Sequence, residues 1–330
     1  MQQLLLGFLL IAFLSSSAIS WWQIVLMLIG GGGCFVYALY KYQEGLLFQP
    51  VIGGFRTPEQ NPPEYKNPGE KRIAYEDVRF KTVDGETLSG WFIPAKHTEG
   101  KDASKEAKME LQLNSATILY FHANAGNMGF RMPFLERLHD CTPCNIFIIS
   151  YRGYGHSTGT PSEGGVYKDA DASLSWLIKS KKVHPDRIVL FGRSLGGAVA
   201  INLASRNQYQ IKGLILENTF TSISDIADKL FPFLFPIKPF ILRLNFPSLE
   251  LIKTVQIPIL FVSGQDDEIV PTEHMQALWD AAKAAPLCRI LRVPGGKHNN
   301  TWMEAEEKSM YFDVLKDFIS TILPDAPKHQ

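Results

Sequence analysis

Three side chains that lie far apart in the chain have the types and the local settings that acyl-transfer chemistry requires. Ser194 stands between two glycines in Gly-Arg-Ser-Leu-Gly, Asp267 lies in SGQDDEIVP, and His298 lies in PGGKHNN. A histidine that takes the proton of a serine hydroxyl, oriented in turn by a carboxylate, makes that serine a nucleophile toward an acyl carbonyl. We therefore interpret Ser194, Asp267 and His298 as a nucleophile, an orienting acid and a general base.

The residues around Ser194 predict a sharp turn between a strand and a helix. RIVLF before it is typical of a buried strand, and GGAVAINLAS after it is typical of a packed helix. Gly192 and Gly196 fit such a turn, because larger residues there would clash with the adjoining strand and helix. The hydroxyl would then stand at a helix N-terminus, where backbone N–H groups favour negative charge. A simple helix cap at Ser194 is the alternative interpretation.

Two other carboxylates could replace Asp267 as the acid. Asp266 is its neighbour in the chain, and Glu217 ends an earlier apolar run in LENTF. We favour Asp267, because Asp-x-x-Val-Pro places a turn directly after the acid and starts a helix at Pro271.

Acyl transfer also needs hydrogen-bond donors for the oxyanion that forms during attack. The backbone N–H of Leu195, directly after the nucleophile, is one expected donor. The other is expected from the loop after ATILYF, at Ala123 or Asn124. We interpret His122, which opens this loop, as a structural hydrogen-bonding residue.

Six apolar runs, each followed by a loop and a segment of helix length, predict the frame that positions these residues. Continuous apolar strands that alternate with helices predict a mostly parallel sheet covered on both faces. In such sheets the site lies beyond the carboxyl ends of the strands, where all the candidate residues fall. Asp84-Gly85 within an alternating stretch predicts a preceding hairpin. The runs are ATILYF, CNIFIIS, RIVLF, IKGLILEN, IPILFVSG and RILRVPGG.

The first forty residues contain no Asp, Glu, Lys, Arg or His. Residues 20–40 predict a single transmembrane helix, since about 20 apolar residues span about 30 Å as a helix. Residues 1–40 are therefore assigned to a membrane anchor. Residues 1–18 hold a second apolar run, which we leave open as a cleaved signal or a second membrane segment. Residues 41–70, rich in Pro, Gly and polar residues, predict a linker.

The overall composition excludes two classes of function. The 33 basic and 33 acidic residues balance, which disfavours a nucleic-acid-binding surface. Cys141 and Cys144 form a C-x-x-C, but no second pair completes a zinc site. We interpret them as packed thiols, with a redox role as the alternative. The chemistry of Ser194, Asp267 and His298 requires no metal and no cofactor.

Several motifs together resemble one family. FHANAGN, YRGYGHSTG, FGRSLGGAVA, ENTF, SGQDDEIVP and GGKHNNTW are similar to the α/β-hydrolase superfamily, and more narrowly to its Bem46-like group. The resemblance covers about residues 70–325, and the preceding anchor fits the same plan. It implies an α/β-hydrolase fold, with a mostly parallel central sheet and helices on both faces, over a catalytic domain of residues 71–325. It also implies a serine hydrolase whose charge-relay set is Ser194, Asp267 and His298.

The resemblance implies ester or thioester substrates of acyl-lipid or palmitoyl-protein type. Insertions in this fold often build a lid, here a small cap over about residues 221–255. Its apolar stretch KLFPFLFPIKPFILRLNF predicts an acyl-chain pocket or a contact with the bilayer, with ordinary packing of a short cap helix as the alternative. The side chains expected there are Phe231, Phe233, Phe235, Phe240 and Leu242.

Two questions stay open at this point. Relatives commonly have His-Gly-Asn where this chain has His122-Ala123-Asn124, and alanine lacks the conformational freedom of glycine. A scaffold with weak or no turnover at a membrane is therefore a second hypothesis. A dehalogenase is disfavoured, because it needs an aspartate where Ser194 stands. Lys41 after the predicted span favours a cytosolic domain, whereas the resemblance implies a lumenal one.

Overall fold

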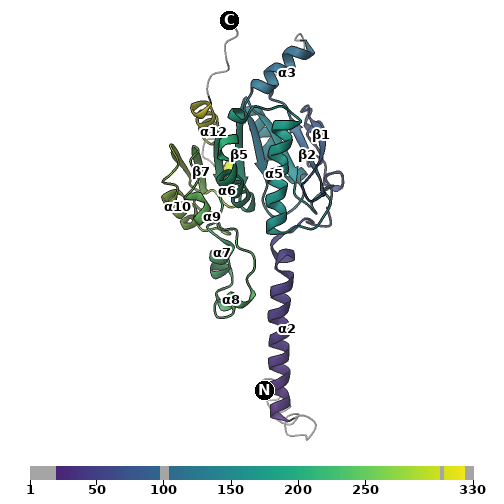
Figure 1. The fold of residues 1–330 in the computed structure, drawn as a ribbon, viewed down its shortest axis with the longest axis vertical. Coiled ribbons are helices and arrows are strands. Elements are labelled where there is room, and N and C mark those ends of the chain that lie inside the picture. The colour runs from purple at the N-terminus through teal and green to yellow at the C-terminus, as the bar shows by residue number, and fades with distance from the viewer. Residues whose placement is uncertain (1–19, 97–103, 305–307, 324–330) are drawn as a thin grey trace.

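The computed structural model describes residues 20–96, 104–304 and 308–323 of the chain (Figure 1). It contains one eight-stranded sheet in the order β1-β2-β4-β3-β5-β6-β7-β8. Strand β2 runs antiparallel to both of its neighbours, and the remaining pairs are parallel. The predicted mostly parallel sheet is therefore confirmed. The strands are β1 (Glu76–Lys81), β2 (Thr87–Ile93), β3 (Thr117–Phe121), β4 (Asn145–Ser150), β5 (Ile188–Arg193), β6 (Gly213–Glu217), β7 (Ile259–Gly264) and β8 (Cys288–Val293).

Helices cover both faces of this sheet, and each face has its own apolar core. Successive side chains of a strand point to opposite faces. Leu119 and Phe121 of β3 pack toward one core, and Ile118 and Tyr120 pack toward the other. The first core is closed by α5 (Glu163–Lys179), α6 (Leu195–Asn207), α9 (Ser248–Ile252) and α10 (Thr272–Ala281), and the second by α4 (Met132–Cys141) and α12 (Lys308–Ile322). The inner strands β3 to β7 are buried on both sides, which explains their continuous apolar runs.

The remaining elements are short, apart from α2. They are α3 (Lys105–Asn114), α7 (Ile223–Leu230), α8 (Lys238–Ile241), α11 (Thr301–Glu304) and the 3₁₀ turns η1 (Pro58–Gln60), η2 (Pro68–Lys71), η4 (Met128–Arg131), η5 (Pro185–Arg187), η6 (Gln208–Gln210) and η7 (Pro232–Leu234).

A long apolar helix, α2 (Trp21–Leu47), projects from the globular body (Figure 1). Its 27 residues extend about 40 Å, and its apolar stretch is exposed along its length. By length and composition this one helix is able to cross a membrane. The helix continues seven residues beyond the expected end at residue 40. Residues 41–47 read KYQEGLL, which contains good helix formers and no proline.

The segment expected to be a linker, residues 41–70, is anchored to the globular body through a few buried residues, although many of its other residues are exposed. After the last turn of α2, Phe48 is only 2% exposed, and the N–H of Gln49 donates to the carbonyl of Asn124 at 3.1 Å. Pro58 and Pro68 start 3₁₀ turns and are buried. Proline and glycine indicate irregular backbone, but they do not indicate whether that backbone packs on a core. The composition alone therefore could not separate a free linker from this packed one.

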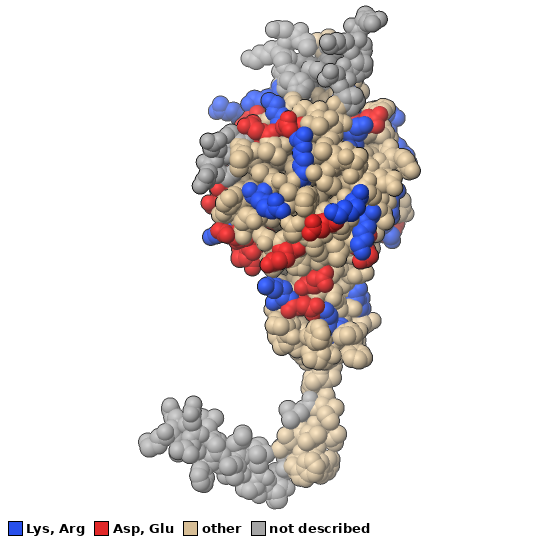
Figure 2. All heavy atoms as spheres, turned by 90° about the vertical axis from the view of Figure 1, so that its left-hand side faces the viewer, with Lys and Arg blue, Asp and Glu red and all other residues tan. Residues whose placement is uncertain are grey.

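The cap, residues 221–255 between β6 and β7, lies beside α2 (Figure 1). The amide of Gln43 fastens the two, because it donates to the carbonyl of Ile241 at 2.9 Å and accepts from the N–H groups of Arg243 and Leu244 at 2.8 and 2.9 Å. Glu44 adds an ion pair to Arg243 at 2.7 Å. Figure 2 shows charged residues gathered over the globular body, whereas the tip of the cap and the exposed length of α2 carry few charges.

Candidate active site

Ser194 occupies a strained turn between β5 and α6. Its φ of 53° and ψ of −121° lie outside the regions that L-residues ordinarily adopt. The turn needs its two glycines, since a Cβ at Gly196 would overlap the carbonyl oxygen of Phe121 and one at Gly192 would overlap the carbonyl of Gly196 itself. The Ser194 N–H donates to the carbonyl of Glu217 at 2.9 Å, which anchors the turn to β6. The backbone thus lifts the hydroxyl above the sheet.

The structure brings Ser194, His298 and Asp267 into one hydrogen-bonded row. His298 Nε2 lies 3.0 Å from Ser194 Oγ, and His298 Nδ1 lies 2.8 Å from Asp267 Oδ2. The other carboxylate oxygen of Asp267 accepts from the N–H groups of Ile269 and Val270 at 2.9 and 2.8 Å. The carboxylate holds the Nδ1–H of the imidazole, so the lone pair of Nε2 faces the serine hydroxyl. This geometry lets His298 take the Ser194 proton.

The two alternative carboxylates lie in other settings. Asp266 is exposed to solvent. Glu217 is fully buried and forms an ion pair with Arg193 at 2.8 Å, and it also accepts a hydrogen bond from the hydroxyl of Tyr311 at 2.8 Å. Of the three candidate acids, the geometry joins Asp267 to His298.

Leu195 and Ala123, two of the residues expected to supply oxyanion donors, line the same cavity as Ser194. Leu195 is the first residue of α6, so its N–H has no partner within the helix. Ala123 lines the same cavity as Ser194, and its φ is not positive. Alanine in place of the relatives' glycine therefore adds no backbone strain, which removes the observation that had favoured a scaffold.

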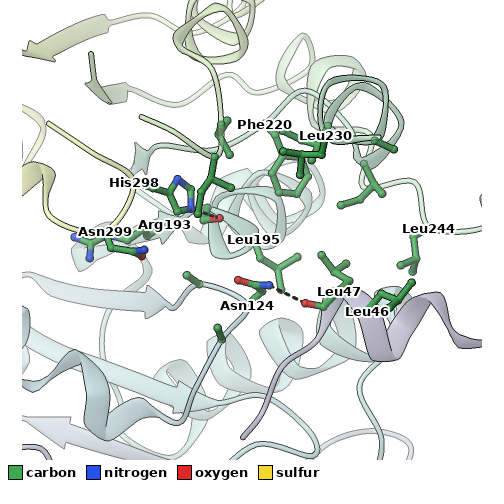
Figure 3. A pocket seen from close by; sticks show the side chains of 18 of the residues that line it. Leu46, Leu47, Asn124, Arg193, Leu195, Phe220, Leu230, Leu244, His298 and Asn299 are labelled. Atoms are coloured by element: carbon green, nitrogen blue, oxygen red, sulfur yellow. Dashed lines mark hydrogen bonds between the residues drawn. The ribbon is translucent and has the colours of Figure 1, made fainter. Parts of the chain in front are cut away.

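The side chain of Asn124 contacts the end of α2. Its Nδ2 donates to the carbonyl of Leu47, the last residue of α2, at 2.8 Å (Figure 3). The backbone carbonyl of Asn124 accepts hydrogen bonds from the N–H of Gln49 and the hydroxyl of Tyr154. The amide of Asn124 thus links the oxyanion loop to the end of the apolar helix.

His122 is a buried structural residue, as interpreted from the sequence. Its Nδ1 lies 2.7 Å from the carbonyl of Ala123, which can only accept, so the proton is on Nδ1. The ring packs 4.4 Å from that of Tyr151, whose hydroxyl donates to the carbonyl of His122 at 3.0 Å. Burial lowers the pKa of His122 to about 3, so the ring stays neutral at physiological pH.

This burial predicts a loss of stability in acid. Below pH 6.5 the unfolded chain protonates His122 while the folded chain does not, so the free energy of unfolding falls as the pH drops from about 6.5 toward 3. The expected contribution of this residue between pH 7.5 and 5.5 is about 1.4 kcal/mol. Unfolding by urea at the two pH values measures it.

The control for this experiment is an exposed histidine. His122→Gln is expected to flatten the pH dependence relative to the unaltered protein, and His184→Gln, whose side chain is 69% exposed, is expected to leave it unchanged. Equal slopes for the unaltered protein and the His122 variant would contradict the assignment.

A cavity of about 990 Å³ opens at Ser194 and His298. One end lies between α2 and the cap, and Figure 3 shows Leu46, Leu47 and Leu244 on that side, away from His298, Asn299 and Arg193. The lining of this acyl end is almost entirely apolar: Phe35, Leu39, Leu46, Leu47, Phe220, Ile226, Leu230, Phe231, Phe233, Leu234, Leu242 and Leu244, with Gln43. The volume is at the upper end of the range typical of small-molecule sites, roughly 300–1,000 Å³.

Three of the five side chains expected in an acyl pocket line this cavity, namely Phe231, Phe233 and Leu242. Phe235 and Phe240 lie outside its lining, and their exposed fractions are 67% and 77%. The expectation that they line the pocket is corrected. Successive residues of short turns point in different directions, so a run of phenylalanines cannot all face one cavity.

The sequence analysis missed the contribution of α2 to the cavity. Phe35, Leu39, Gln43 and Leu46 had been assigned to the anchor and the linker. The available signal was the amphipathic continuation of the helix past residue 40, where Gln43 interrupts the apolar residues.

The cysteine pair lies away from this site. Cys141 and Cys144 are free thiols, and Cys144 is fully buried. Burial raises the pKa of the Cys144 thiol to about 12, which disfavours the reactive thiolate. Within the described residues, no three His, Cys, Asp or Glu side chains gather as a metal site.

Comparison with known proteins agrees with this fold. A family model described as the alpha/beta hydrolase fold matches residues 116–239. The alpha/beta hydrolase domain-containing protein WAV2 of Arabidopsis thaliana is 36% identical over 305 residues, which cover 89% of this chain and 92% of WAV2. The chain belongs to the α/β-hydrolase family. Protein Bem46 of Schizosaccharomyces pombe is also 36% identical, over 86% of this chain and 87% of Bem46. The resemblance of this hydrolase to the Bem46-like group is therefore confirmed.

Two further similarities concern the membrane and the fold. YNL320W of Saccharomyces cerevisiae, whose name describes it as a membrane protein, is 33% identical to this hydrolase over 86% of the chain and 91% of its own length. Among solved structures, the Pyrococcus furiosus esterase Pf2001 superposes with a TM-score of 0.61, at 19% identity, over 84% of this chain and 99% of its own. At this identity the esterase shows the fold alone.

Proposed function

We propose that this α/β-hydrolase is a membrane-anchored serine hydrolase that cleaves ester or thioester bonds of acyl-lipid or palmitoyl-protein type substrates. One observation supports the proposal most directly. The hydrogen-bonded side chains of Ser194, His298 and Asp267 lie at an apolar cavity, and helix α2 forms one wall of that cavity. The catalytic group and the apolar helix thus belong to one site.

The proposed reaction proceeds through an acyl-enzyme. His298 Nε2 takes the proton of Ser194 Oγ as the oxygen attacks the acyl carbonyl, and Asp267 stabilises the imidazolium. The N–H groups of Leu195 and Ala123 hold the oxyanion. His298 then gives its proton to the departing alcohol or thiol. In the second half, His298 takes a proton from water, the hydroxide attacks the acyl-enzyme, and the fatty acid leaves as Ser194 regains its proton.

The acyl end of the cavity supports a long apolar chain as the acyl group. Each methylene buried there contributes about 0.8 kcal/mol, which corresponds to about fourfold in binding. A chain that runs from Ser194 toward Leu39 would contact α2 on one side and Phe231 of the cap on the other. We therefore expect turnover efficiency to rise with chain length.

The exposed phenylalanines of the cap support a contact with the bilayer. Phe235 and Phe240 lie on the segment that packs beside α2, and both are mostly exposed. If α2 spans a membrane, these rings meet the same leaflet, and the cavity opens toward lipid. The name of the yeast relative favours the same location.

Hydrolysis of a graded series of esters tests the proposed function. Full-length protein in neutral detergent micelles is assayed with p-nitrophenyl esters of 4 to 18 carbons and with one long-chain acyl thioester. We expect kcat/KM to increase with chain length and Ser194→Ala to remove the activity. Absence of turnover above the Ser194→Ala background in every substrate would favour the scaffold hypothesis instead.

Filling the cavity from the side of α2 is predicted to change the chain-length preference. Leu39→Trp places a larger side chain in the acyl end. We expect kcat/KM for a 16-carbon ester to fall about 10- to 50-fold, because several methylene groups of the acyl chain can no longer be buried in the cavity. For the 4-carbon ester, kcat/KM should change less than twofold. The measurement is kcat/KM for both esters in micelles.

The matched control is another leucine of the same helix. Leu26 is 57% exposed and does not line the cavity, so Leu26→Trp should leave both esters unaffected. Equal losses for long and short esters in Leu39→Trp would argue against an acyl chain beside α2.

A further inference from the structure

Among the described residues, the cavity lining contains two arginines and no carboxylate. Figure 3 shows Arg193 and Asn299 on the side away from Leu46 and Leu47. We call the following set of lining residues the second end of the cavity: Tyr65, Phe130, Arg131, Pro133, Phe134, Arg193, Asn299, Trp302 and Met303. The rings of Phe134 and Trp302 lie 5.9 Å apart, and the Arg193 guanidinium lies 4.6 Å from the Phe134 ring, so these side chains form one wall. It is the only part of the cavity lining among the described residues that carries arginine.

The two arginines differ in how their charge is balanced. Arg193 is paired with the buried carboxylate of Glu217 at 2.8 Å. Arg131 has no acidic partner within the described residues, and its single hydrogen bond runs from Nη2 to the carbonyl of Ala125. Its Nε is buried without a partner. An arginine carries five N–H donors, so several of those of Arg131 have no acceptor within the described residues.

An unbalanced cation in such a place is unfavourable for the free protein. Burial lowers the pKa of the Arg131 guanidinium, and the nearby charge of Arg193 acts in the same direction. The guanidinium nevertheless stays protonated at physiological pH. Arg131 is half-buried in a cavity whose lining includes aromatic side chains, where water screens its charge poorly. An anion that enters the cavity would recover this cost.

The position of Arg131 relative to Ser194 indicates which part of a substrate it would meet. Arg131 ends η4, the turn that follows the oxyanion loop, and it is bonded to Ala125 of that loop. Ser194, His298 and Arg131 line the same cavity, and Figure 3 shows His298 beside Arg193 and Asn299, away from Leu46 and Leu47. With the acyl chain between α2 and the cap, the group on the far side of the ester bond extends toward Arg131.

We propose that the second end of the cavity is a subsite for an anionic group, a phosphate or a carboxylate, borne by the alcohol portion of the acyl ester and bound by Arg131. The inference rests on the proposed function and narrows its substrate class to small acyl amphiphiles with an anion close to the ester. Arginine suits both anions, because its planar donors match two acceptor oxygens. The aromatic side chains Tyr65, Phe134 and Trp302 enclose the ion pair and limit its screening.

Matched esters test the subsite. 1-Oleoyl-lysophosphatidic acid and 1-oleoylglycerol share the same acyl ester and differ only by a phosphate, and the oleoyl ester of glycolic acid supplies a carboxylate. In neutral micelles we expect kcat/KM for the phosphate or the carboxylate ester to exceed that for oleoylglycerol by about 10- to 100-fold, the range of a charge-assisted hydrogen bond. The anionic ester with the larger increase in kcat/KM over oleoylglycerol identifies the preferred anion.

Arg131→Gln is expected to abolish this preference by raising KM for the anionic esters, so that kcat/KM falls more for these esters than for oleoylglycerol. Arg131→Lys should retain part of the preference, because the charge is kept. Arg137→Gln on α4 is the matched control, since Arg137 contacts the ring of Phe312 and does not line the cavity. Equal kcat/KM for anionic and neutral esters in the unaltered protein would overturn the proposal. The proposal would also be overturned if Arg131→Gln lowered kcat/KM equally for all three esters and Arg131→Lys restored it equally for each. Arg131 would then only hold the loop in place.

Binding separates this inference from the proposed function. Ser194→Ala protein in micelles is titrated with lysophosphatidic acid and with oleoylglycerol by calorimetry. Tighter binding of the phosphate ester, lost in the Ser194→Ala, Arg131→Gln double variant, supports the subsite even if no ester is turned over. Equal affinities for the two esters would refute the subsite and leave the hydrolase proposal to the assays of turnover.

Discussion

Ser194→Ala and His298→Ala are each expected to lower kcat by about 10⁵- to 10⁶-fold, and the double variant is expected to be no worse than either single one. The two residues act as one unit, because the hydroxyl is a weak nucleophile without the imidazole and the imidazole has no nucleophile to activate without the hydroxyl. The measurement is single-turnover hydrolysis of a long-chain p-nitrophenyl ester, together with covalent labelling by a fluorophosphonate probe.

Two adjacent aspartates provide the control. Asp267→Asn is expected to lower kcat about 10⁴-fold, because an amide cannot hold the Nδ1–H tautomer of His298. Asp266→Asn alters an exposed neighbour and should change kcat less than twofold. Labelling that persists in Ser194→Ala, or equal losses in the two aspartate variants, would contradict the arrangement in the structure.

Glu217→Gln is expected to lower the free energy of unfolding by about 3–5 kcal/mol. The variant leaves Arg193, which is 3% exposed, without its carboxylate, and the remaining buried charge is costly. It also weakens the hydrogen bond from Tyr311. Thermal unfolding in micelles measures the change as a drop of the midpoint by several degrees.

A surface pair serves as the control for Glu217. Glu250 pairs with Lys253 at 3.0 Å, with side chains 70% and 50% exposed, so Glu250→Gln should cost less than about 1 kcal/mol. Replacing both members of the buried pair, as in Arg193→Met with Glu217→Leu, should recover part of the loss, because no charge is then left unpaired. Equal midpoints for Glu217→Gln and the unaltered protein would show that Arg193 finds another partner.

Local signals were enough to predict the sheet and the three residues of the candidate triad. Gly192 and Gly196 are required by contacts within the turn itself, so the pattern around Ser194 predicts its own geometry. Asp267 and His298 each follow a strand, and parallel strands bring such positions to one edge without knowledge of their neighbours. Local sequence order therefore carried most of the information about this part of the site.

The parts of the site that could not be predicted depend on contacts between distant segments. Residues 41–47 are interpreted from the sequence as the start of a linker, and only the contacts of this segment with Ile241 and Leu244 make it a wall of the cavity. Arg131 looks like an ordinary surface cation in the sequence. Arg131 stands out in the structure because no carboxylate among the described residues pairs with it. The sequence does not reveal which side chains surround it.

The hydrogen bond from Asn124 to the carbonyl of Leu47 has a practical consequence for any soluble version of this protein. A chain shortened to begin after Leu47 loses the acceptor that steadies Asn124, next to Ala123, the proposed oxyanion donor, and it loses the leucines of α2 that line the cavity. Rates measured on such a fragment would describe an enzyme with a loosened loop and a missing wall. If α2 spans a bilayer as proposed, a change in bilayer thickness that tilts the helix pulls on the loop through this one amide, so the turnover rate depends on lipid composition.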